Sequence, residues 1–298
     1  IYWNGNTGEI KDSNFTNNKA LGIANATDAF GNVTYGGDGG AVIWIGPNGL
    51  VDNCRFINNT ANKRGGAVYL QGTAEANCTN TNFTHVYFKD NVAGTNGGAI
   101  DWNRGAMYGV VEYCEFEHNI ANRSGGAVFW NGLNGTIAHS NFTDNHALGI
   151  TNATSVMGDV TYGGDGGAIM WSGPVGTVND VRIINNTAAK RGGGVFLQGS
   201  YDRNCDNTTF INSIFENNLA GTNGGAIDWN KGAHNGLVDN VTFINNTAKR
   251  SGGAIYWYGY NGTIQYSKFY NNTALGLTNA TNLDGVVTYG GDGGAVIW

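Results

Sequence analysis

The sequence predicts an all-β solenoid, a three-sided parallel β-helix of about nine coils. Gly-Gly-Ala triplets, one of them written Gly-Gly-Gly, recur in steps of 26, 32, 28 and 41 residues. This 127-residue series then repeats without an insertion or a deletion, and an Asn-x-Ala motif stands upstream of each triplet. Repetition on this scale indicates that each repeat is one coil, which buries its apolar face only against its neighbours.

The 127-residue series divides the chain into two full units and part of a third, residues 1–127, 128–254 and 255–298. No linker or change of composition separates the units, so we expect one continuous β-helix rather than two globular domains. Both ends of the sequence fall inside a repeat, since its first three residues align with residues 128–130. We therefore interpret it as an interior segment of a longer chain.

The composition is typical of many tight turns joined by short strands. Among 298 residues there are 49 glycines and 2 prolines, and the charged fraction of 13% is about half the usual quarter. The net charge of −6 is spread along the chain without a Lys/Arg cluster, which argues against nucleic-acid binding. No run of 18 apolar residues is present, so we expect no membrane insertion in this segment.

A four-residue strand is predicted after each pair of glycines. Its second residue is Val or Ile, and its fourth is Trp or Leu and includes all 8 tryptophans. Side chains alternate across a strand, so the third residue, which is Asp101 or Asp228 in two coils, lies on the opposite face. Because an unpaired buried carboxylate is costly, we place the tryptophans in the core and expect both aspartates to be exposed. The alternative is an exterior Trp ladder that stacks on sugars.

Two further strands complete the predicted coil. The second carries a Val or Ile such as Val51, and the third carries a Phe or Ile such as Phe56. The spacing from Val51 to Cys54 is odd and that from Cys54 to Phe56 is even, so a straight strand cannot place all three side chains inside. The chain must bend near residues 52–53, and three strands with three corners make a triangular coil.

An asparagine follows the Phe position by three residues in every coil, and an alanine follows it by five. We predict that these asparagines form a ladder of amides bonded from coil to coil, because Asn also tolerates the left-handed backbone of a tight corner. The Gly-Gly pairs supply positive φ at another corner. The ladder residues are Asn18, Asn59, Asn91, Asn119, Asn145, Asn186, Asn218, Asn246 and Asn272.

The four cysteines are predicted to lie too far apart for disulfides. Cys54 and Cys114 share a column two coils apart, about 10 Å, and Cys78 and Cys205 are one unit apart, about 19 Å. We interpret Cys54 and Cys114 as small buried thiols. Cys78 and Cys205 fall in an inserted loop, where exposure is an open alternative.

Insertions recur at the same places in each unit. A long one of 15 residues projects every fourth coil from the same edge, and insertions in solenoids collect on the functional face. The long insertions cover residues 21–36, 148–163 and 275–290, and shorter ones lie near residues 73–82, 200–209, 104–108 and 231–235.

Asn-x-Ser/Thr sequons are the strongest functional signal. They recur at one place in all three long loops, and in Asn-Asn-Thr the first asparagine can point outward while the second joins the ladder. Sequons of this kind are typical of surface segments in secreted glycoproteins. The glycosylation candidates are Asn25, Asn152, Asn279, Asn58, Asn185, Asn245, Asn271, Asn134 and Asn261.

The pairing of Gly-Gly-Ala-(Ile/Val) with Phe-x-x-Asn resembles the repeats of the chlamydial polymorphic outer-membrane proteins. The fuller form, C-R-F-I-N-N-T-A at residues 54–61 followed by G-G-A-V at 65–68, is similar to adhesin-like surface proteins of methanogenic archaea. The resemblance covers the whole chain. It implies a secreted, cell-surface, right-handed parallel β-helix, and it implies no catalytic residue.

Catalysis and metal binding have weaker support. β-Helix enzymes that act on polysaccharides need a unique carboxylate cluster, whereas the acids here repeat together with basic neighbours. A lone Asp every fourth coil supplies too few oxygen ligands for calcium, and His85, His118, His139, His146 and His234 share no ligand spacing. We expect no enzymatic activity, cofactor or metal. The repeating charges are Asp38, Asp165, Asp292, Asp101, Asp228, Arg64, Arg191, Arg123 and Arg250.

These features predict an extracellular, cell-surface adhesin-like stalk whose regularly spaced, N-glycosylated loops mediate attachment. Weak contacts repeated along such a shaft gain strength through avidity. The expected partners are glycans or proteins on the surface of another cell. The alternatives are a structural subunit of an extracellular filament or sheath, which binds copies of itself, and a polysaccharide-active enzyme.

Overall fold

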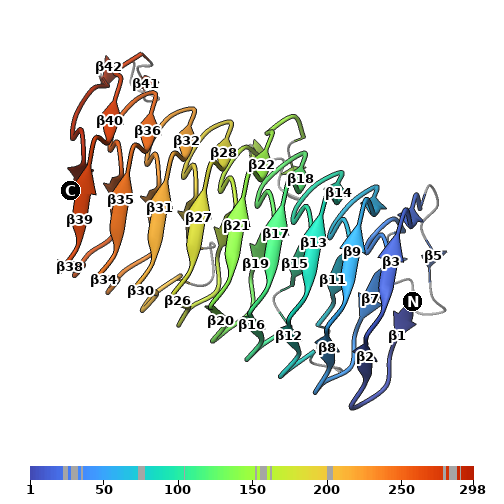
Figure 1. Ribbon diagram of the computed structural model, residues 1–298. Helices are drawn as coiled ribbons and strands as arrows, with labels where there is room; N and C mark the ends of the chain where they lie inside the picture. The colour runs from blue at the N-terminus through green and yellow to red at the C-terminus, as the bar shows by residue number, and fades with distance from the viewer. Residues whose placement is uncertain are drawn as a thin grey trace.

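The computed structural model describes residues 1–298 except 23–25, 28–32, 35, 73–77, 104, 152, 155–159, 162, 200–203, 278–279, 282–286 and 289. The coils stack along one axis, with the two termini at opposite ends (Figure 1). Each coil contributes one strand to each of four parallel sheets. The predicted all-β parallel β-helix is therefore confirmed. None of the described residues forms a helix with the length and apolar character needed to cross a bilayer.

The first sheet, which we call the Trp sheet, contains the tryptophan column. Its strands pair in parallel without slip, so that Trp102 lies opposite Leu70 on one side and Trp130 on the other. Its 10 strands are β1 (Tyr2–Trp3), β7 (Val42–Trp44), β11 (Val68–Leu70), β15 (Ile100–Trp102), β19 (Val128–Trp130), β25 (Ile169–Trp171), β29 (Val195–Leu197), β33 (Ile227–Trp229), β37 (Ile255–Trp257) and β43 (Val296–Ile297).

The second sheet, the Val sheet, points one Val or Ile per coil into the core. Phe83 and Phe210 take this place in the two coils that carry the six-residue insertion. Its 9 strands are β2 (Glu9–Lys11), β8 (Leu50–Asp52), β12 (Asn82–Thr84), β16 (Val110–Glu112), β20 (Thr136–Ala138), β26 (Thr177–Asn179), β30 (Thr209–Ile211), β34 (Leu237–Asp239) and β38 (Thr263–Gln265).

The third sheet, the Phe sheet, runs along the front of Figure 1. Its central Phe or Ile points inward, between two outward side chains. Its 9 strands are β3 (Asn14–Thr16), β9 (Arg55–Ile57), β13 (Tyr87–Lys89), β17 (Glu115–Glu117), β21 (Asn141–Thr143), β27 (Arg182–Ile184), β31 (Ile214–Glu216), β35 (Thr242–Ile244) and β39 (Lys268–Tyr270).

The fourth sheet, the Ala sheet, was not predicted. The Asn-x-Ala segment, which we interpreted as a corner, continues into a two-residue strand that pairs from coil to coil. The coil thus has four sides rather than three. The 9 strands are β4 (Lys19–Ala20), β10 (Thr60–Ala61), β14 (Val92–Ala93), β18 (Ile120–Ala121), β22 (His146–Ala147), β28 (Thr187–Ala188), β32 (Leu219–Ala220), β36 (Thr247–Ala248) and β40 (Thr273–Ala274).

Each long insertion contains a small antiparallel hairpin outside the four sheets. The insertions leave the coil between the Ala sheet and the Trp sheet, and the shorter insertions follow the Trp sheet on its other side. The outer face of the Trp sheet is therefore bordered by insertions on both edges. The hairpins are β5 (Ala26–Thr27) with β6 (Val33–Thr34), β23 (Ala153–Thr154) with β24 (Val160–Thr161), and β41 (Ala280–Thr281) with β42 (Val287–Thr288).

One left-handed residue turns the chain at each of the four corners. In the second coil these residues are Asn48, Asn53, Asn58 and Gly65, with φ of 55°, 50°, 55° and 61°. The predicted bend near residues 52–53 is therefore confirmed. We expected the ladder asparagine to take this conformation, but the residue before it does. That residue points its side chain to solvent, whereas the ladder side chain turns inward.

Glycine is required at the two positions of each Gly-Gly pair for different reasons. At Gly65 a Cβ would lie 2.1 Å from the carbonyl oxygen of Val68, at a positive φ that other residues rarely adopt. At Gly66 a Cβ would lie 2.0 Å from the carbonyl oxygen of Gly98 in the next coil. The first glycine is needed for backbone conformation and the second for close approach between coils.

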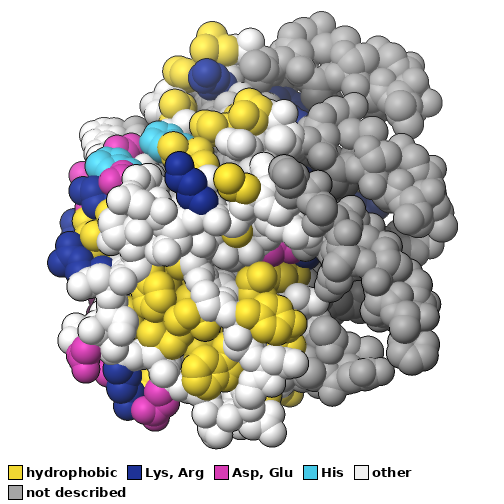
Figure 2. Space-filling model, turned by 90° about the vertical axis from the view of Figure 1, so that its right-hand side faces the viewer, with side chains coloured by type: hydrophobic (Ala, Val, Ile, Leu, Met, Phe, Trp, Pro, Cys, Tyr) yellow, Lys and Arg dark blue, Asp and Glu magenta, His cyan; other side chains and the backbone are white. Residues whose placement is uncertain are grey.

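Stacked aromatic columns fill the core. Trp44, Trp102, Trp130, Trp171 and Trp229 are fully buried, which confirms that tryptophan is a core residue. Neighbouring rings stack in parallel, with centroids 4.2 Å apart for Trp102 and Trp130 and 4.8 Å apart for the next pair. Figure 2 views the N-terminal end, where apolar side chains gather inside the coil and charged side chains follow its left-hand edge.

The asparagine column forms a continuous ladder. At each of its eight steps, the Oδ1 atom of one asparagine accepts hydrogen bonds from the backbone N–H and the Nδ2 of the asparagine in the preceding coil. From Asn59 onward, each Nδ2 also donates to the carbonyl oxygen of the Phe or Ile position one coil earlier, as Asn119 does to Phe88 at 3.0 Å. The seven ladder asparagines between Asn18 and Asn272 are fully buried, so the column is satisfied without solvent.

We predict that Asn119→Ala destabilises the chain by about 3–5 kcal/mol, because it leaves two donors of Asn91 buried without their acceptor and removes one of the two hydrogen bonds to Asn145 Oδ1. Chemical denaturation followed by circular dichroism measures the change. The control is Asn122→Ala, a half-buried asparagine of the same coil outside the ladder, for which we expect less than about 0.5 kcal/mol. Equal, small effects of the two substitutions would contradict the role of the ladder.

Candidate functional site

A row of Asp and Arg side chains lies on the outer face of the Trp sheet. The Nε and Nη2 atoms of Arg64 donate to the two carboxylate oxygens of Asp38 at 3.0 and 2.7 Å. One unit further along, Arg191 makes the same bidentate pair with Asp165, at 2.8 Å for both bonds. The two carboxylates are buried. The structure thus brings together charges that the sequence showed only as repeating neighbours.

Each paired arginine also covers an aromatic ring of the Trp sheet. The guanidinium carbon of Arg64 lies 4.3 Å from the ring centroid of Tyr69, and that of Arg191 lies 4.3 Å from the centroid of Phe196. Stacking of this kind combines cation–π attraction with exclusion of water. Tyr69 and Phe196 are buried as a result, although they lie outside the main core cluster.

Asp101 and Asp228 are buried, which corrects our expectation that both aspartates are exposed. Asp101 lies between Arg64 and Arg123 along the chain, and Asp228 lies between Arg191 and Arg250. The exposed fractions of the two aspartates are 2% and 0%. They do lie at the outward position of the strand, in register with Tyr69 and Phe196, but arginine and aromatic side chains from adjacent coils close this face over them. The expectation failed because outward and exposed are not equivalent here.

The two copies satisfy these carboxylates differently. Asn230 donates to Asp228 Oδ1 at 3.1 Å, whereas the equivalent Asn103 donates to the Tyr69 hydroxyl at 2.6 Å. The second copy has Phe196 in place of the tyrosine, which frees the amide for the carboxyl. In both copies the Oδ2 atom has no hydrogen-bond partner among the described residues.

Burial raises the pKa of the Asp101 carboxyl to about 7, although the nearby Arg64 guanidinium acts in the opposite direction. Burial likewise raises the pKa of Asp228 to about 7, opposed by Arg191 and by the hydrogen bond from Asn230. Both carboxyls therefore change charge near neutral pH. Transfer of a charged group out of water is the dominant cause.

A pocket of about 470 Å³ opens at the second copy of the row. Four cationic side chains and two tyrosines line it, namely Lys190, Arg191, Lys231, Arg250, Tyr256 and Tyr258. Thr222, Asn223 and Asn230 complete the wall. Sequence analysis missed the two lysines and the two tyrosines. A sequence signal exists only for Lys190, which belongs to a Lys-Arg pair just before Gly-Gly-Gly, as Lys63 belongs to one before Gly-Gly-Ala.

The first unit carries the same polar positions 127 residues earlier. Lys63, Arg64, Thr95, Asn96 and Arg123 are identical in type to their counterparts in the second unit. The two tyrosines differ, because their places are taken by Phe129 and Asn131. The charged part of the pocket is thus repeated, while its aromatic part belongs to the second unit.

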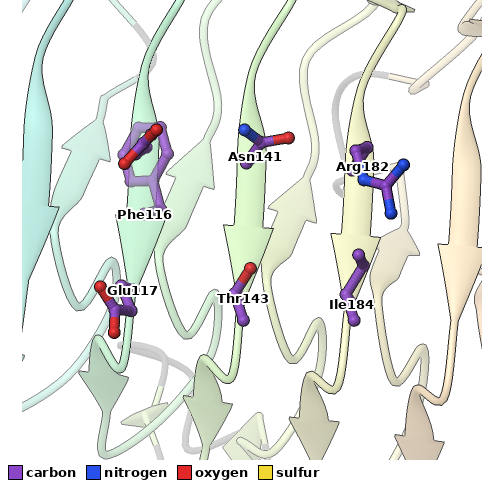
Figure 3. A pocket seen from close by; sticks show the side chains of 7 residues that line it. Phe116, Glu117, Asn141, Thr143, Arg182 and Ile184 are labelled. Carbon is purple, nitrogen blue, oxygen red and sulfur yellow. The ribbon is translucent and has the colours of Figure 1, made fainter.

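A second, smaller hollow of about 280 Å³ lies on the outer face of the Phe sheet. Figure 3 shows Asn141 and Arg182 side by side on neighbouring strands, with Glu117, Thr143 and Ile184 in the row below. Its polar side chains are exposed or half-buried and include both signs of charge. None of the polar side chains that line this hollow is buried, so the pocket on the Trp sheet is the stronger candidate.

The histidines are exposed or half-buried, as expected for surface residues. His85, His118 and His139 are left-handed corner residues, His146 lies in β22, and His234 lies between β33 and β34. His85, Tyr113 and His139 stack on one another, with ring centroids 5.3 and 4.9 Å apart. His118 Nε2 lies 2.8 Å from an oxygen of Asp144. Within the described ranges, no three His, Cys, Asp or Glu side chains are grouped so that they could hold a metal ion.

All four cysteines are buried thiols. This agrees with our interpretation of Cys54 and Cys114 and excludes exposure of Cys78 and Cys205, the alternative we left open. Cys78 Sγ lies 3.5 Å from Thr81 Oγ1, and its burial raises the pKa of the thiol to about 11. The six-residue insertion returns to the coil at this point, so its last residues pack into the core.

The sequons divide into two sets. Asn25, Asn152 and Asn279 lie outside the described residues. The other six candidates are exposed, and all of them are left-handed corner residues with the side chain directed to solvent. Asn58 Nδ2 donates one hydrogen to Asn17 Oδ1 at 2.6 Å, which leaves the second for a glycan bond. The exposed candidates are Asn58, Asn134, Asn185, Asn245, Asn261 and Asn271.

The sequence profile of the Chlamydia polymorphic membrane protein repeat matches residues 53–71, 85–101, 212–228 and 240–256. The first match covers β9, β10 and β11, which include a ladder asparagine and a glycine corner. The chain is similar to this repeat in that part of the coil, as the Phe-x-x-Asn and Gly-Gly-Ala motifs indicated. No curated protein matched the chain.

We predict that Asp101→Asn removes a pH-dependent loss of stability. The folded pKa of about 7 exceeds the unfolded value of 3.8, so the carboxyl's stabilising protonated form is lost as pH rises toward and through 7. The free energy of unfolding of the variant, relative to that of wild type, should therefore rise by about 3 kcal/mol from pH 5 to pH 8. Denaturant unfolding at each pH measures it. The control is Asp12→Asn on an exposed corner. An equal difference at both pH values would show that Asp101 is ionised throughout.

Proposed function

We propose that this chain is the shaft of an extracellular, cell-surface adhesin-like stalk. The observation that carries the proposal is the regular display of one face. Nine coils hold the outer face of the Trp sheet in fixed register, and each 127-residue unit borders that face with the same insertions and the same charged row. Similarity to a membrane-protein repeat supports a place at the cell surface.

Attachment through this face would depend on repetition. A rigid solenoid keeps equivalent sites at constant spacing, so that several weak contacts form together once the first has formed. The expected partners are glycans or proteins on the surface of another cell. The similarity to surface proteins of methanogenic archaea remains a prediction from the fuller repeat.

We expect beads coated with the 298-residue chain to adhere to cells in a panel of diverse surface glycans. Because bead display is multivalent, half-maximal binding should need at least about 100-fold less chain than binding of the soluble monomer. Flow cytometry measures both, and excess soluble chain should displace the beads.

Two other results would redirect the proposal. Beads that adhere to no cell, together with ordered polymers of the purified chain in electron micrographs, would favour the filament or sheath subunit. Release of soluble products from polysaccharides would favour the enzyme.

We further propose that the chain is N-glycosylated, because the exposed corner asparagines place their side chains in solvent. Intact mass spectrometry of native material, before and after enzymatic removal of N-glycans, should show a loss of mass in steps of one glycan. Peptide mapping should locate occupancy at Asn58, Asn185 or Asn245 rather than at the buried Asn59, Asn186 or Asn246. An unchanged mass would exclude the chain as a glycan carrier and leave its corners available for direct contact.

A further inference from the structure

The pocket on the outer face of the Trp sheet has an excess of positive charge. Lys190, Arg191, Lys231 and Arg250 line it, against the two buried carboxyls of Asp165 and Asp228 behind its wall. Asp165 is held by Arg191. A third carboxyl, that of Asp292, belongs to the coil beside Arg250, since Gly252 N donates to the Asp292 carbonyl oxygen. Four cations against three carboxyls leave a positive excess that favours an anion, although the whole chain has a net charge of −6.

The same pocket presents aromatic surface. Tyr256 and Tyr258 follow each other along β37 and its exit, and Tyr258 is 59% exposed. An aromatic side chain offers an apolar face and a polar hydroxyl at low conformational cost. The apolar C–H face of a sugar ring packs on such a surface, whereas a bare inorganic anion gains nothing from it.

Asn223 favours a ligand that donates a hydrogen bond. It lines the pocket with an exposed fraction of 7%, and its Oδ1 atom has no partner among the described residues. The equivalent oxygen of Asn96 in the first unit is also without a described partner. Buried acceptors are nearly always satisfied in folded proteins, so this atom is suited to receive a ligand hydroxyl.

We propose that this pocket binds an acidic sugar residue of a polysaccharide, a pyranose that carries a carboxylate or a sulfate. The cations hold the acidic group, the tyrosines pack on the ring, and Asn223 accepts a hydrogen bond from a ring hydroxyl. This inference rests on the adhesive function proposed above, to which it adds the class of ligand. Because the charged positions are repeated in the first unit, one polymer can contact the charged positions of both units at once.

The volume of about 470 Å³ matches one or two sugar rings and lies within the range of small-ligand sites. A nucleic acid needs a basic track along many phosphates. The cations of this pocket are instead confined to adjacent coils, and the chain as a whole is acidic. The chemistry therefore favours an acidic glycan.

Isothermal titration calorimetry of the 298-residue chain with trigalacturonate, a sulfated galactotriose and neutral galactotriose tests the proposal. At least one acidic ligand should bind about tenfold or more tightly than the neutral one. Lys231→Glu should weaken that binding about tenfold or more, because it places a carboxylate at the acidic group. Tyr258→Ala should weaken it about fivefold through loss of ring packing.

The matched control is Lys268→Glu, which makes the same change of charge on the exposed face of the Phe sheet. It should stay within about twofold of wild type, as a rim charge away from the pocket does. Lys231 and Tyr258 are exposed, so their variants should melt with wild type by circular dichroism. If Lys231→Glu nevertheless unfolds, Tyr258→Ala decides. Equal affinity for acidic and neutral ligands, equal loss in the two lysine variants, or no binding would overturn the proposal.

Bead adhesion separates this inference from the adhesive function. If wild-type beads adhere and Lys231→Glu beads adhere equally well, the stalk is adhesive through another surface and the acidic-sugar site is wrong. If the chain binds trigalacturonate through Lys231 but its beads adhere to no cell, the site stands and the adhesive function fails. Loss of both adhesion and sugar binding in Lys231→Glu, with both retained in Lys268→Glu, supports the two together.

Discussion

The buried asparagine ladder is the constraint on which the register of the shaft depends. Each interior amide uses its oxygen for two donors of the preceding coil and its nitrogen for the next amide and a carbonyl of the preceding coil, as Asn119 does with Asn91, Asn145 and Phe88. A slip of one residue would leave all these groups buried without partners. The penalty for an unsatisfied buried group exceeds the gain from a typical hydrogen bond, so the ladder acts mainly by excluding other registers. The parallel Trp and Phe stacks then follow, because identical residues are forced to lie above one another.

A fixed register at the ladder permits variation elsewhere. The insertions enter on either side of the Trp sheet, and the left-handed corners other than the Gly-Gly corner accept Asn, Asp, His, Tyr, Thr or Val without loss of the coil. The ladder asparagine and both glycines of each pair lack this freedom: the asparagine is fully bonded, a Cβ on the first glycine would meet a backbone oxygen of its own coil, and the second glycine touches the next coil. Structure and display are thus assigned to different columns of the same repeat.

Sequence periodicity predicted what each residue contributes within its own coil. The Trp, Val and Phe columns, the bend at Asn53 and the asparagine ladder all follow from spacing alone. The Ala sheet was missed because two residues are too short to show a period of two. The left-handed position was placed one residue late, at Asn59 rather than Asn58, since both are asparagines.

Other features depend on neighbouring coils, and spacing within one coil cannot reveal them. Asp101 is outward in its own strand and becomes buried only because Arg64, from the coil before, lies over Tyr69. Cys78 belongs to an insertion and becomes buried only where that insertion rejoins the core. The pocket is likewise built from the turns before β29, β33 and β37, from the residues just after β33, and from β37 and its exit, so no single repeat contains it.

The charged row on the Trp sheet does not stabilise the fold well, which suggests that it serves binding instead. A carboxyl buried with one oxygen unpaired costs free energy that a well-packed apolar side chain in its place would not. Yet Asp101 and Asp228, with Arg64 and Arg191, are the same in both units, while three of the residues around them differ: Tyr69 corresponds to Phe196, Phe129 to Tyr256 and Asn131 to Tyr258. The paired charges are the same where these aromatic and amide positions are not. A costly arrangement, kept on the one face that the insertions border, is better explained by what that face binds than by what holds the coil together.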